Sequence, residues 1–351
     1  MIKIAIDKGP NVKGDSIRGI GMHMRLLVDE LKKNKEILIE EVDCWDQNIS
    51  KKYNVVHFPS FHPNFLSLPF FKNTKIVLTI HDLIRLIYPS KYPSGIKGKI
   101  YFLINWILIS RVDQIITISE TSKKDIIRFL NIPDEKISVI YLAAGESYRI
   151  INDRKLLSII KNKYDLPSEF ILYTGDVNYN KNLITLCEAA VRLKKYLVIV
   201  GKQAADDNVD FSNIENKPFR EFLNKYGDNK FIKRLGFVSN DDLSLIYNLA
   251  TVYCQPSFYE GFGLPILEAF ASGCPVVASR TQVFTEIADG AFLPFDPYSV
   301  DSLVDSLNKV LVNKLLQKKL ISKGFECNSN FSWKKTANET LQVYQRVAGM
   351  K

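Results

Sequence analysis

Short runs of apolar residues alternate with amphipathic segments along almost the whole chain of 351 residues. The apolar runs are rich in Ile and Val at both odd and even positions, which is typical of strands buried on both faces of a parallel sheet. They predict strands at Ile2–Ile6, Val55–Pro59, Lys75–Ile80, Gln114–Ser119, Ser138–Leu142, Phe170–Thr174, Tyr196–Val200, Phe231–Leu235, Thr251–Gln255, Pro275–Ala278 and Ala291–Phe295. Helical periodicity lies between them, as in Ile20–Lys33, Ser122–Leu130, Leu183–Lys194 and Asp241–Leu249. This order predicts an α/β protein with doubly wound parallel sheets.

The alternation starts twice, which predicts two Rossmann-like domains. The chain turns polar over residues 150–168, and Pro167 precedes a new strand, so we place the boundary at Leu166. Domains of residues 1–166 and 167–330 would then face a central cleft, because ligands of open α/β sheets bind at the carboxyl ends of the strands. Within residues 331–351, the amphipathic segment Trp333–Val347 is expected as a helix that caps a domain or crosses back to the N-terminal one.

The stretch Ile100–Ser110 is conspicuously apolar but shorter than the ~20 residues that span a bilayer. Lys91, Lys97 and Lys99 precede it, so a helix resting on a membrane surface is one interpretation. We favour a buried crossover helix, because its place between two strands requires a helix there.

Composition bounds the class of protein. Hydrophobic residues make up 46% and charged residues 24%, which is globular and excludes long disorder. The five cysteines form no CxxC pair, which argues against a disulfide framework or a zinc site. The N-terminus reads as a strand and lacks the apolar run of a signal peptide, so we expect a cytoplasmic protein.

The net charge of +9 is concentrated in the N-terminal half. Up to Leu166 there are 26 Lys and Arg against 18 Asp and Glu, and beyond it 21 against 20. This asymmetry favours an acidic partner for the N-terminal half, which could be an anionic lipid surface, a phosphate-bearing substrate or nucleic acid. The alternative is a basic surface that is only solvated and has no such partner.

The segment Gln255–Pro275 carries the candidate chemistry. A strand ends, a loop with Gly261 and Gly263 follows, and a helix is expected to begin near Pro265. Free N–H groups and the dipole of a helix N-terminus suit a diphosphate, and glycines let a ligand approach the backbone.

Two glutamates lie eight residues apart in this segment. We place Glu260 in the loop and Glu268 in the first helical turn. Ionised carboxylates only accept hydrogen bonds, so hydroxyls of a sugar and a ribose are their natural partners. Alternatively, Glu268 complements the helix dipole and Glu260 is solvated; the two glycines, the proline and the preceding strand favour the binding role.

The run Glu260–Glu268, EGFGLPILE, resembles the EX7E motif of retaining glycosyltransferases of the GT-B fold, particularly family 4, the glycosyl transferases group 1. The resemblance covers nearly the whole chain. Its further motifs occur in the order typical of the family, at Ile80–Ile84, Thr117–Ser122, Leu172–Gly175, Lys181–Asn182, Gly236–Val238 and Asn330–Trp333.

The resemblance implies roles for individual residues. Glu260 would bind hydroxyls of the donor sugar and Glu268 the ribose, while Lys181 would hold the donor phosphate. The backbone amides of Phe262, Gly263 and Leu264 would hold the sugar and the diphosphate.

Further positions are implied more weakly. Gly19 and Gly21, in Arg18–Gly21, resemble a loop over the donor phosphates, although a lone GxG is more often only a turn. His81 resembles the histidine that faces the transferred sugar, with a purely structural role as the alternative. Phe237 and Val238 would border the base.

One departure concerns the second phosphate cation. Many relatives carry an arginine after the strand that matches Phe170–Thr174, where this chain has Asp176 and Asn180. Arg18 or Lys202 would have to supply that charge, or the leaving group is stabilised less.

By resemblance, the reaction would be metal-independent hexosyl transfer with retention, through front-face attack and without a cofactor. GDP-mannose is slightly favoured over a UDP-sugar as donor. A glycan or lipid-linked acceptor of surface polysaccharide assembly is expected, at the inner face of the membrane and without nucleic acid as a partner. A nucleotide-sugar epimerase, a glycogen-phosphorylase-like enzyme and a non-catalytic nucleotide-sugar-binding subunit are the alternatives.

Overall fold

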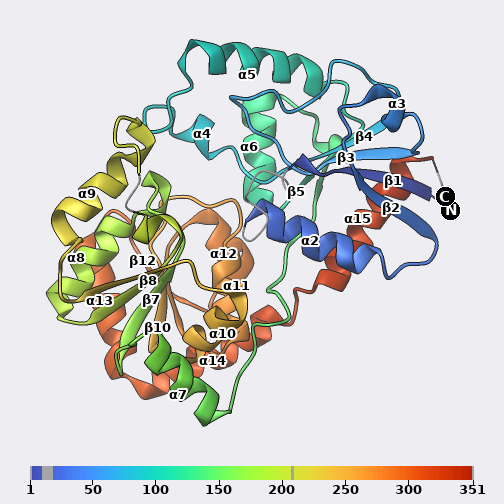
Figure 1. Ribbon diagram of the computed structural model, residues 1–351. Helices are drawn as coiled ribbons and strands as arrows, with labels where there is room; N and C mark the ends of the chain where they lie inside the picture. The colour runs from blue at the N-terminus through green and yellow to red at the C-terminus, as the bar shows by residue number, and fades with distance from the viewer. Residues whose placement is uncertain (1, 10–18, 207–208, 350–351) are drawn as a thin grey trace. The chain divides into compact units, whose positions relative to one another are not determined.

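The computed structural model describes residues 2–9, 19–206 and 209–349 (Figure 1). The chain divides into an N-terminal unit, Met1–Ala143 with Phe331–Lys351, and a C-terminal unit, Ala144–Asn330. The division therefore falls earlier than the boundary expected at Leu166. Helix α7 (Arg154–Lys163) belongs with the C-terminal unit because it packs on α10 (Asn240–Leu249).

The N-terminal unit is built on a six-stranded sheet of order β2-β1-β3-β4-β5-β6, in which every neighbouring pair is parallel. Its strands are β1 (Ile2–Asp7), β2 (Ile37–Val42), β3 (Val55–Phe58), β4 (Lys75–Ile80), β5 (Gln114–Thr117) and β6 (Ile137–Val139). Its helices are α2 (Ile20–Leu31), α3 (Gln47–Ser50), α4 (Ile84–Ile87), α5 (Gly95–Ile109), α6 (Glu120–Leu130), η1 (Asp134–Lys136) and α15 (Trp333–Val347).

Strand β2 was not predicted from the sequence. It is the edge strand of the sheet, and only Ile37 and Ile39 of its residues are buried. An edge strand with exposed Glu40 and Glu41 lacks the continuous apolar run that identifies central strands.

Helix α15 returns from the C-terminal end of the chain to the N-terminal unit, where it packs on α2 and β4. The hydroxyl of Thr336 donates to the carbonyl of Tyr141 at 2.7 Å, and the hydroxyl of Tyr344 lies 2.7 Å from His57 Nδ1. The predicted helix Trp333–Val347 thus forms with the expected bounds.

Helix α5 contains the apolar stretch and connects β4 to β5 after α4. The expectation of a buried crossover helix was wrong in one respect, because only Gly98, Asn105, Leu108 and Ile109 of this helix are buried. Its other side carries exposed apolar residues, including Ile96 at 83% and Leu103 at 58% exposure.

The C-terminal unit has a second parallel sheet, of order β12-β11-β10-β7-β8-β9. Its strands are β7 (Phe170–Thr174), β8 (Tyr196–Val200), β9 (Ile232–Gly236), β10 (Val252–Gln255), β11 (Val276–Ser279) and β12 (Leu293–Phe295). Besides α7 and α10, its helices are η2 (Tyr179–Lys181), α8 (Leu183–Leu193), η3 (Gln203–Ala205), η4 (Ile214–Asn216), α9 (Lys217–Tyr226), α11 (Leu264–Ala271), α12 (Gln282–Ala288), α13 (Val300–Val312) and α14 (Lys314–Asn328).

The order of this second sheet is doubly wound, which confirms the predicted fold class. The chain runs outward from β7 to β9, then returns to the other side of β7 and runs outward again from β10 to β12. Strands β7 and β10 therefore flank the point where the order reverses. The connections that follow two such strands separate at their carboxyl ends and leave the usual ligand position of this fold.

Candidate functional site

The connection from β10 to α11 requires a glycine at the start of the helix. Gly263, the N-cap of α11, has a φ of 112°, a conformation that L side chains rarely adopt. A Cβ at this position would also lie 2.7 Å from Cε1 of Phe284. Pro265, the second residue of α11, has no N–H, and the N–H of Ile266 donates to the Gly263 carbonyl at 2.9 Å. The positive end of the helix dipole at Leu264 favours an anion near the start of the helix.

One expectation about this helix was wrong. Because α11 begins at Leu264, Glu268 is its fifth residue and lies in the second turn rather than the first. Its carboxylate is therefore not placed to cap the helix N-terminus, so the alternative in which Glu268 only complements the dipole loses its basis.

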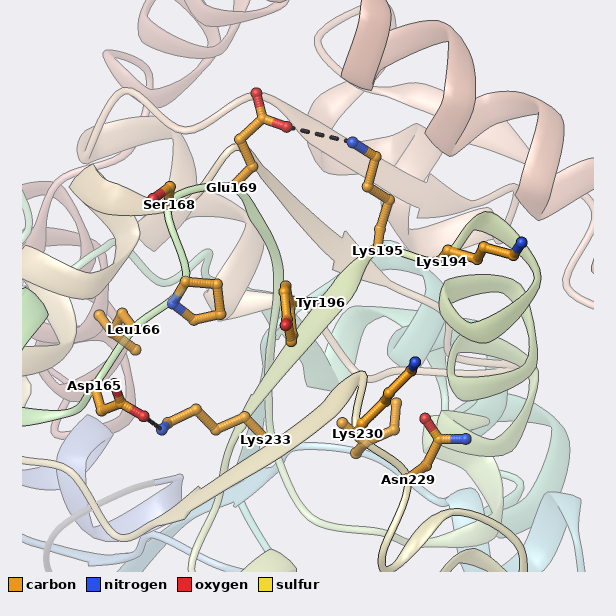
Figure 2. Close-up of a pocket in the computed structure, with 12 residues that line it drawn as sticks. Asp165, Leu166, Ser168, Glu169, Lys194, Lys195, Tyr196, Asn229, Lys230 and Lys233 are labelled. Carbon is orange, nitrogen blue, oxygen red and sulfur yellow. Dashed lines mark hydrogen bonds and ion pairs between the residues drawn. The ribbon is translucent and has the colours of Figure 1, made fainter.

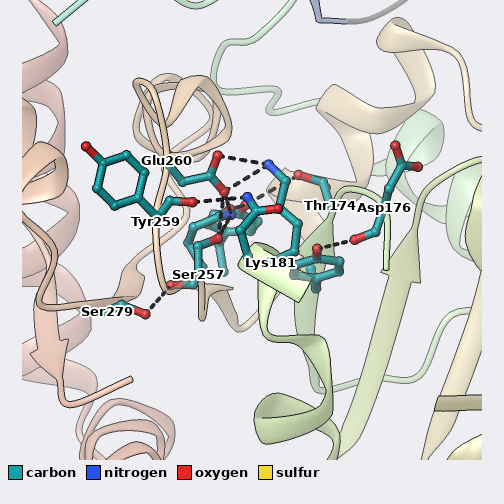
Figure 3. Close-up of polar contacts among 11 residues, drawn as sticks. Thr174, Asp176, Lys181, Ser257, Tyr259, Glu260 and Ser279 are labelled. Carbon is teal, nitrogen blue, oxygen red and sulfur yellow. Dashed lines mark hydrogen bonds and ion pairs between the residues drawn. The ribbon is translucent and has the colours of Figure 1, made fainter. Parts of the chain in front are cut away.

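Lys181 and Glu260 meet where the strand order reverses. Lys181 follows β7, and Glu260 follows β10. Lys181 Nζ lies 2.8 Å from Oε1 and 2.9 Å from Oε2 of Glu260, and Figure 3 shows the two side chains pointing toward one another. In this structure the ammonium of Lys181, which is expected to hold a donor phosphate, pairs with a carboxylate of the chain itself.

Glu260 is 8% exposed and is held by further donors. Its Oε1 accepts from the Ser257 hydroxyl at 2.6 Å and from Gln255 Nε2 at 3.0 Å (Figure 3). A buried carboxylate needs such donors because removal from water disfavours the charge. With the ammonium of Lys181 added, one rotamer of Glu260 is fixed.

A chain of buried hydroxyls connects the two glutamates. The Tyr253 hydroxyl donates to Oε1 of Gln255, and it lies 3.4 Å from the hydroxyl oxygen of Thr174. Thr174 in turn lies 3.0 Å from the Tyr247 hydroxyl, which donates to Glu268 Oε2 at 3.1 Å. Side chains from β7, β10 and α10 therefore fix the positions of both glutamates relative to one another.

The two tyrosines in this chain remain protonated near neutral pH. Burial raises the pKa of Tyr247 and of Tyr253 well above the usual value, and the negative charge of Glu268 raises both further. Each hydroxyl is consequently a hydrogen-bond donor, which suits a carboxylate and an amide oxygen as acceptors.

Two asparagines tie the connection after β7 to the connection after β10. Asn180 Nδ2 donates to the carbonyl of Tyr259 at 3.1 Å, and the N–H of Phe258 donates to the Asn180 carbonyl at 2.7 Å. Asn182 has a φ of 53° and donates through Nδ2 to the carbonyl of Pro256 at 3.0 Å. Sequence reasoning noted Asn180 only as the place of a missing cation, and it missed Asn182 as a positioning residue. Asn180 and Asn182, the polar residues on either side of Lys181, were the available signal.

The position of a second phosphate cation is not filled locally. Asp176 is exposed and its backbone carbonyl accepts from the Tyr173 hydroxyl, and Lys202 is exposed just beyond β8. Arg18, the other candidate, lies outside the described residues.

His81 directly follows β4 in the N-terminal unit and pairs with a second histidine. His81 Nε2 lies 2.8 Å from Nδ1 of His23, and the indole of Trp333 packs on the His23 ring. Burial lowers the pKa of His81 to about 4 and that of His23 well below its usual value, so both rings are neutral near pH 7. Within the described residues, Nδ1 of His81 is buried with no hydrogen-bond partner.

The remaining predicted residues divide between loop and core. Gly19 is exposed with a φ of 62° at the N-cap of α2, whereas Gly21 is buried inside that helix and not in a loop. Phe237 is 50% exposed just beyond β9, and Val238 beside it is buried. The structure thus leaves Gly19 and Phe237 accessible.

A separate pocket lies at the opposite, amino ends of β7, β8 and β9 (Figure 2). Its lining includes Lys194, Lys195, Lys230 and Lys233. Two of these cations pair with carboxylates in the same pocket, Lys195 with Glu169 at 3.3 Å and Lys233 with Asp165 at 2.8 Å. It contains none of the candidate site residues.

None of the helices in the described part of the chain combines the length and the apolar character that a membrane crossing needs.

The chain matches two family models. Residues 158–326 match the model "Glycosyl transferases group 1", and residues 18–143 match "Glycosyltransferase Family 4". Among curated proteins it is similar to the O-antigen chain mannosyltransferase B of Escherichia coli, with 28% identity over 97% of this chain and 88% of that protein.

Two solved structures have the same fold across both units. Sucrose-phosphate synthase from Thermosynechococcus elongatus superposes with a TM-score of 0.77 at 17% identity, covering 99% of this chain and 100% of that chain. Anabaena HepE, solved in complex with UDP-glucose, gives a TM-score of 0.75 at 14% identity with the same coverage. The matched models, the mannosyltransferase relative and the paired doubly wound sheets agree, and the chain belongs to the GT-B glycosyltransferases of group 1, family 4.

Proposed function

We propose that the chain is a retaining hexosyltransferase that moves a hexose from a nucleoside-diphosphate sugar to a glycan or lipid-linked acceptor in surface polysaccharide synthesis. GDP-mannose is the favoured donor and a UDP-sugar the second choice. The Escherichia coli relative is named a mannosyltransferase, which supports mannose as the transferred sugar. HepE was solved with UDP-glucose, which supports a nucleotide sugar as the donor class.

The observation that carries the proposal is the Lys181–Glu260 pair beside the N-terminus of α11. Lys181 brings a cation, the start of α11 brings the positive end of the helix dipole, and Glu260 brings an acceptor for hydroxyls. A sugar diphosphate offers the complementary groups, because its phosphate oxygens are anionic and its sugar carries hydroxyl donors. When the donor binds, its diphosphate would replace Glu260 as the ionic partner of Lys181. A sugar hydroxyl would replace Lys181 as a hydrogen-bond donor to Glu260.

The other contacts follow from this placement. The amides of Phe262, Gly263 and Leu264 would hold the sugar and the diphosphate, and Glu268, oriented by Tyr247, would accept hydroxyls of the ribose. We keep Gly19, the exposed N-cap of α2, as a proposed contact to the donor phosphates; Gly21, buried within that helix, is no longer proposed as one. Phe237 and Val238, directly after β9, remain the proposed border of the base.

The proposed reaction needs no covalent intermediate on the protein. The bond between the anomeric carbon and the phosphate oxygen breaks, and its electron pair leaves with the nucleoside diphosphate. The acceptor hydroxyl oxygen bonds to the same face of the sugar, and its proton passes to the departing phosphate oxygen. Configuration is retained, and Lys181 stabilises the negative charge that grows on the leaving group.

We also propose a role for His81 toward the transferred sugar. Its Nδ1 is buried and lacks a partner among the described side chains, so a sugar hydroxyl would satisfy it. Because the ring is neutral near pH 7, it would act as a hydrogen-bonding group rather than as a cation.

Transfer is proposed to proceed without a metal ion, at the cytoplasmic face of the membrane where a lipid-linked acceptor would be presented. Addition of a chelator to the purified protein should then leave the rate unchanged. A rate that falls with the chelator and returns with Mg²⁺ or Mn²⁺ would contradict this part of the proposal.

A thermal-shift panel of nucleotides and nucleotide sugars tests the donor assignment, because a ligand that binds only the native state raises Tm. GDP and GDP-mannose should raise Tm more than UDP and UDP-glucose, and slow hydrolysis of the preferred donor should occur without acceptor. Binding without hydrolysis or transfer would favour the non-catalytic subunit, and an epimerised sugar nucleotide would favour the epimerase. Near wild-type turnover in Glu260→Gln would refute the role of Glu260.

A further inference from the structure

Helix α5 lies on the outside of the N-terminal unit (Figure 1), and it carries a stripe of exposed apolar residues. Ile96, Ile100, Leu103 and Ile107 follow one another at helical spacing, and they are 83%, 55%, 58% and 55% exposed. Trp106, at 45% exposure, lies next to this stripe. We call these five residues the α5 surface. A soluble helix normally turns such residues toward the core, so their exposure needs a partner.

The opposite side of α5 is tightly fixed to its own unit. Asn105 is fully buried, its Nδ2 donates to the Phe65 carbonyl at 2.6 Å, and its Oδ1 accepts from the N–H of Ser67 at 3.0 Å. Arg111, just beyond the helix, donates to the carbonyl of Phe70 at 2.8 Å. Phe65 and Phe70 in this loop are each 62% exposed, which places more apolar surface beside the helix. The α5 surface is thus an ordered feature of the fold and not a frayed segment.

The part of the chain that contains the α5 surface is rich in basic residues. Residues 47–112 contain nine Lys and Arg and a single acid, Asp82, and no acid at all occurs between Leu83 and Val112. The next residue, Asp113, pairs with Lys72 and Lys75 and not with a lysine of α5. Lys97 and Lys99 lie on the exposed part of α5 itself. This one segment therefore accounts for most of the charge of +9 that the whole chain carries.

We propose that the α5 surface docks this protein on an anionic lipid bilayer, with the apolar stripe in the interface and the lysines at the headgroups. Ile, Leu and Trp side chains enter the headgroup and acyl boundary, and flanking lysines are attracted to anionic lipid. A second copy of the chain fits less well, because a symmetric contact through α5 would bring the lysines of both copies together without an acid between them. The inference deepens the proposed function, since it names the surface that would bring the protein to a lipid-linked acceptor.

Vesicle co-sedimentation tests the proposal without donor or acceptor. Wild-type protein should sediment with vesicles of phosphatidylglycerol and phosphatidylcholine, much less with phosphatidylcholine alone, and less at high salt. The variant Ile96→Gln/Ile100→Gln/Leu103→Gln should bind on the order of 10-fold more weakly or worse, because apolar side chains supply the insertion. Lys97→Gln/Lys99→Gln should lose the preference for the anionic vesicles.

Matched controls come from the other unit. Ile159, Ile214 and Leu315 are also exposed apolar residues, and their replacement by Gln should leave vesicle binding unchanged. Lys318→Gln/Lys319→Gln removes two positive charges from α14, and it should also leave vesicle binding unchanged. All variants should keep the wild-type Tm, since the replaced side chains are exposed.

The proposal fails if the α5 triple variant sediments like the wild type, or if the wild type does not bind anionic vesicles. It also fails if light scattering shows self-association that the triple variant abolishes, because a second copy would then be the occupant of the surface. Transfer to a water-soluble acceptor should be equal in wild type and triple variant. If the protein binds vesicles but transfers no sugar, the membrane surface stands and the proposed function is wrong. If it transfers sugar but does not bind vesicles, the proposed function stands and the membrane surface is wrong.

Discussion

Lys181 Nζ lies 2.8 Å and 2.9 Å from the two carboxylate oxygens of Glu260, although the residues are 79 positions apart in the chain. The pair cancels charge at the point where the proposed donor diphosphate binds. Donor binding must therefore exchange one partner of Lys181 for another.

This exchange predicts opposite effects of two substitutions on nucleotide affinity. Glu260→Gln frees the ammonium, so the affinity for GDP should stay equal or rise up to about fivefold, as expected for a part-buried ion pair worth about 1 kcal/mol. Lys181→Gln should weaken GDP binding. Both should lower kcat on the order of 10²-fold, because Glu260→Gln weakens a sugar contact and Lys181→Gln removes the cation that stabilises the negative charge on the leaving group.

Isothermal titration and steady-state kinetics measure these effects. Lys195→Gln is the control, because Lys195 pairs with Glu169 at the other end of the sheet. Weaker GDP binding in Glu260→Gln would mean that the ion pair is needed to hold Lys181 in place and not to be exchanged.

Gly263→Ala should destabilise the protein at the start of α11. The substitution combines a φ of 112° with a Cβ 2.7 Å from the Phe284 ring, and such strain costs about 1–3 kcal/mol or more. Gly290→Ala is the control, because it has a similar positive φ of 74° but its Cβ would meet only Lys323 Nζ, at 3.3 Å. Equal losses of unfolding free energy in urea would show that the Phe284 contact is unimportant.

Tyr247→Phe should raise the KM for the donor. The substitution removes the hydrogen bond to Glu268, together with the contacts of the same hydroxyl to the Thr174 hydroxyl and the Pro265 carbonyl. The bond to Glu268 is worth about 1 kcal/mol, so we expect roughly a fivefold rise in KM with little change in kcat. Tyr173→Phe is the matched control, because its buried hydroxyl donates only to the backbone carbonyl of Asp176. A similar KM change in both variants would point to general loosening rather than to orientation of Glu268.

The N-terminal unit should lose stability as the pH falls below neutrality. Burial lowers the pKa of His57 from 6.5 to about 3, so between these pH values His57 is protonated in the unfolded chain and neutral in the folded chain. His57 does not lower the free energy of unfolding above pH 6.5. As the pH falls from 6.5 toward about 3, its preference for the neutral form in the folded chain lowers the free energy of unfolding by up to about 1.4 kcal/mol per pH unit.

Urea unfolding between about pH 7 and pH 5 measures this slope. His57→Gln keeps a hydrogen-bonding group opposite Tyr344 but cannot titrate in this range, so its free energy of unfolding should depend less on pH. An identical slope in the variant would assign the pH dependence to other groups, such as His23 and His81.

The central strands and the amphipathic helices were predictable from the sequence. Lys75–Ile80, Phe170–Thr174, Tyr196–Val200 and Trp333–Val347 form with the predicted bounds, because a buried strand or a regular amphipathic helix leaves a local pattern. Edge strand β2 has no such pattern. For α5, the favoured interpretation as a buried helix was wrong, and only the alternative of a helix on a membrane surface allowed for its exposed apolar side. The apolar composition of a helix does not indicate which way its residues point.

The candidate site was predictable only in part. Glu260 and Lys181 stood out as charged residues between a strand and a helix, and Glu268 as a charged residue in the helix that follows Glu260. The pairing of Lys181 with Glu260 depends on the adjacency of β7 and β10. The same holds for Tyr253, Thr174 and Tyr247, which are ordinary core residues in the sequence. Only the reversal of strand order brings their hydroxyls into one chain between the glutamates.

A crystal structure of the wild-type protein with bound GDP tests the central claim most directly. The diphosphate is predicted to contact Lys181 Nζ and the N–H groups at Gly263 and Leu264, with Glu260 released from Lys181 and Glu268 facing the ribose. A diphosphate in the lysine-lined pocket at the amino ends of β7, β8 and β9, with the Lys181–Glu260 pair intact, would contradict the account.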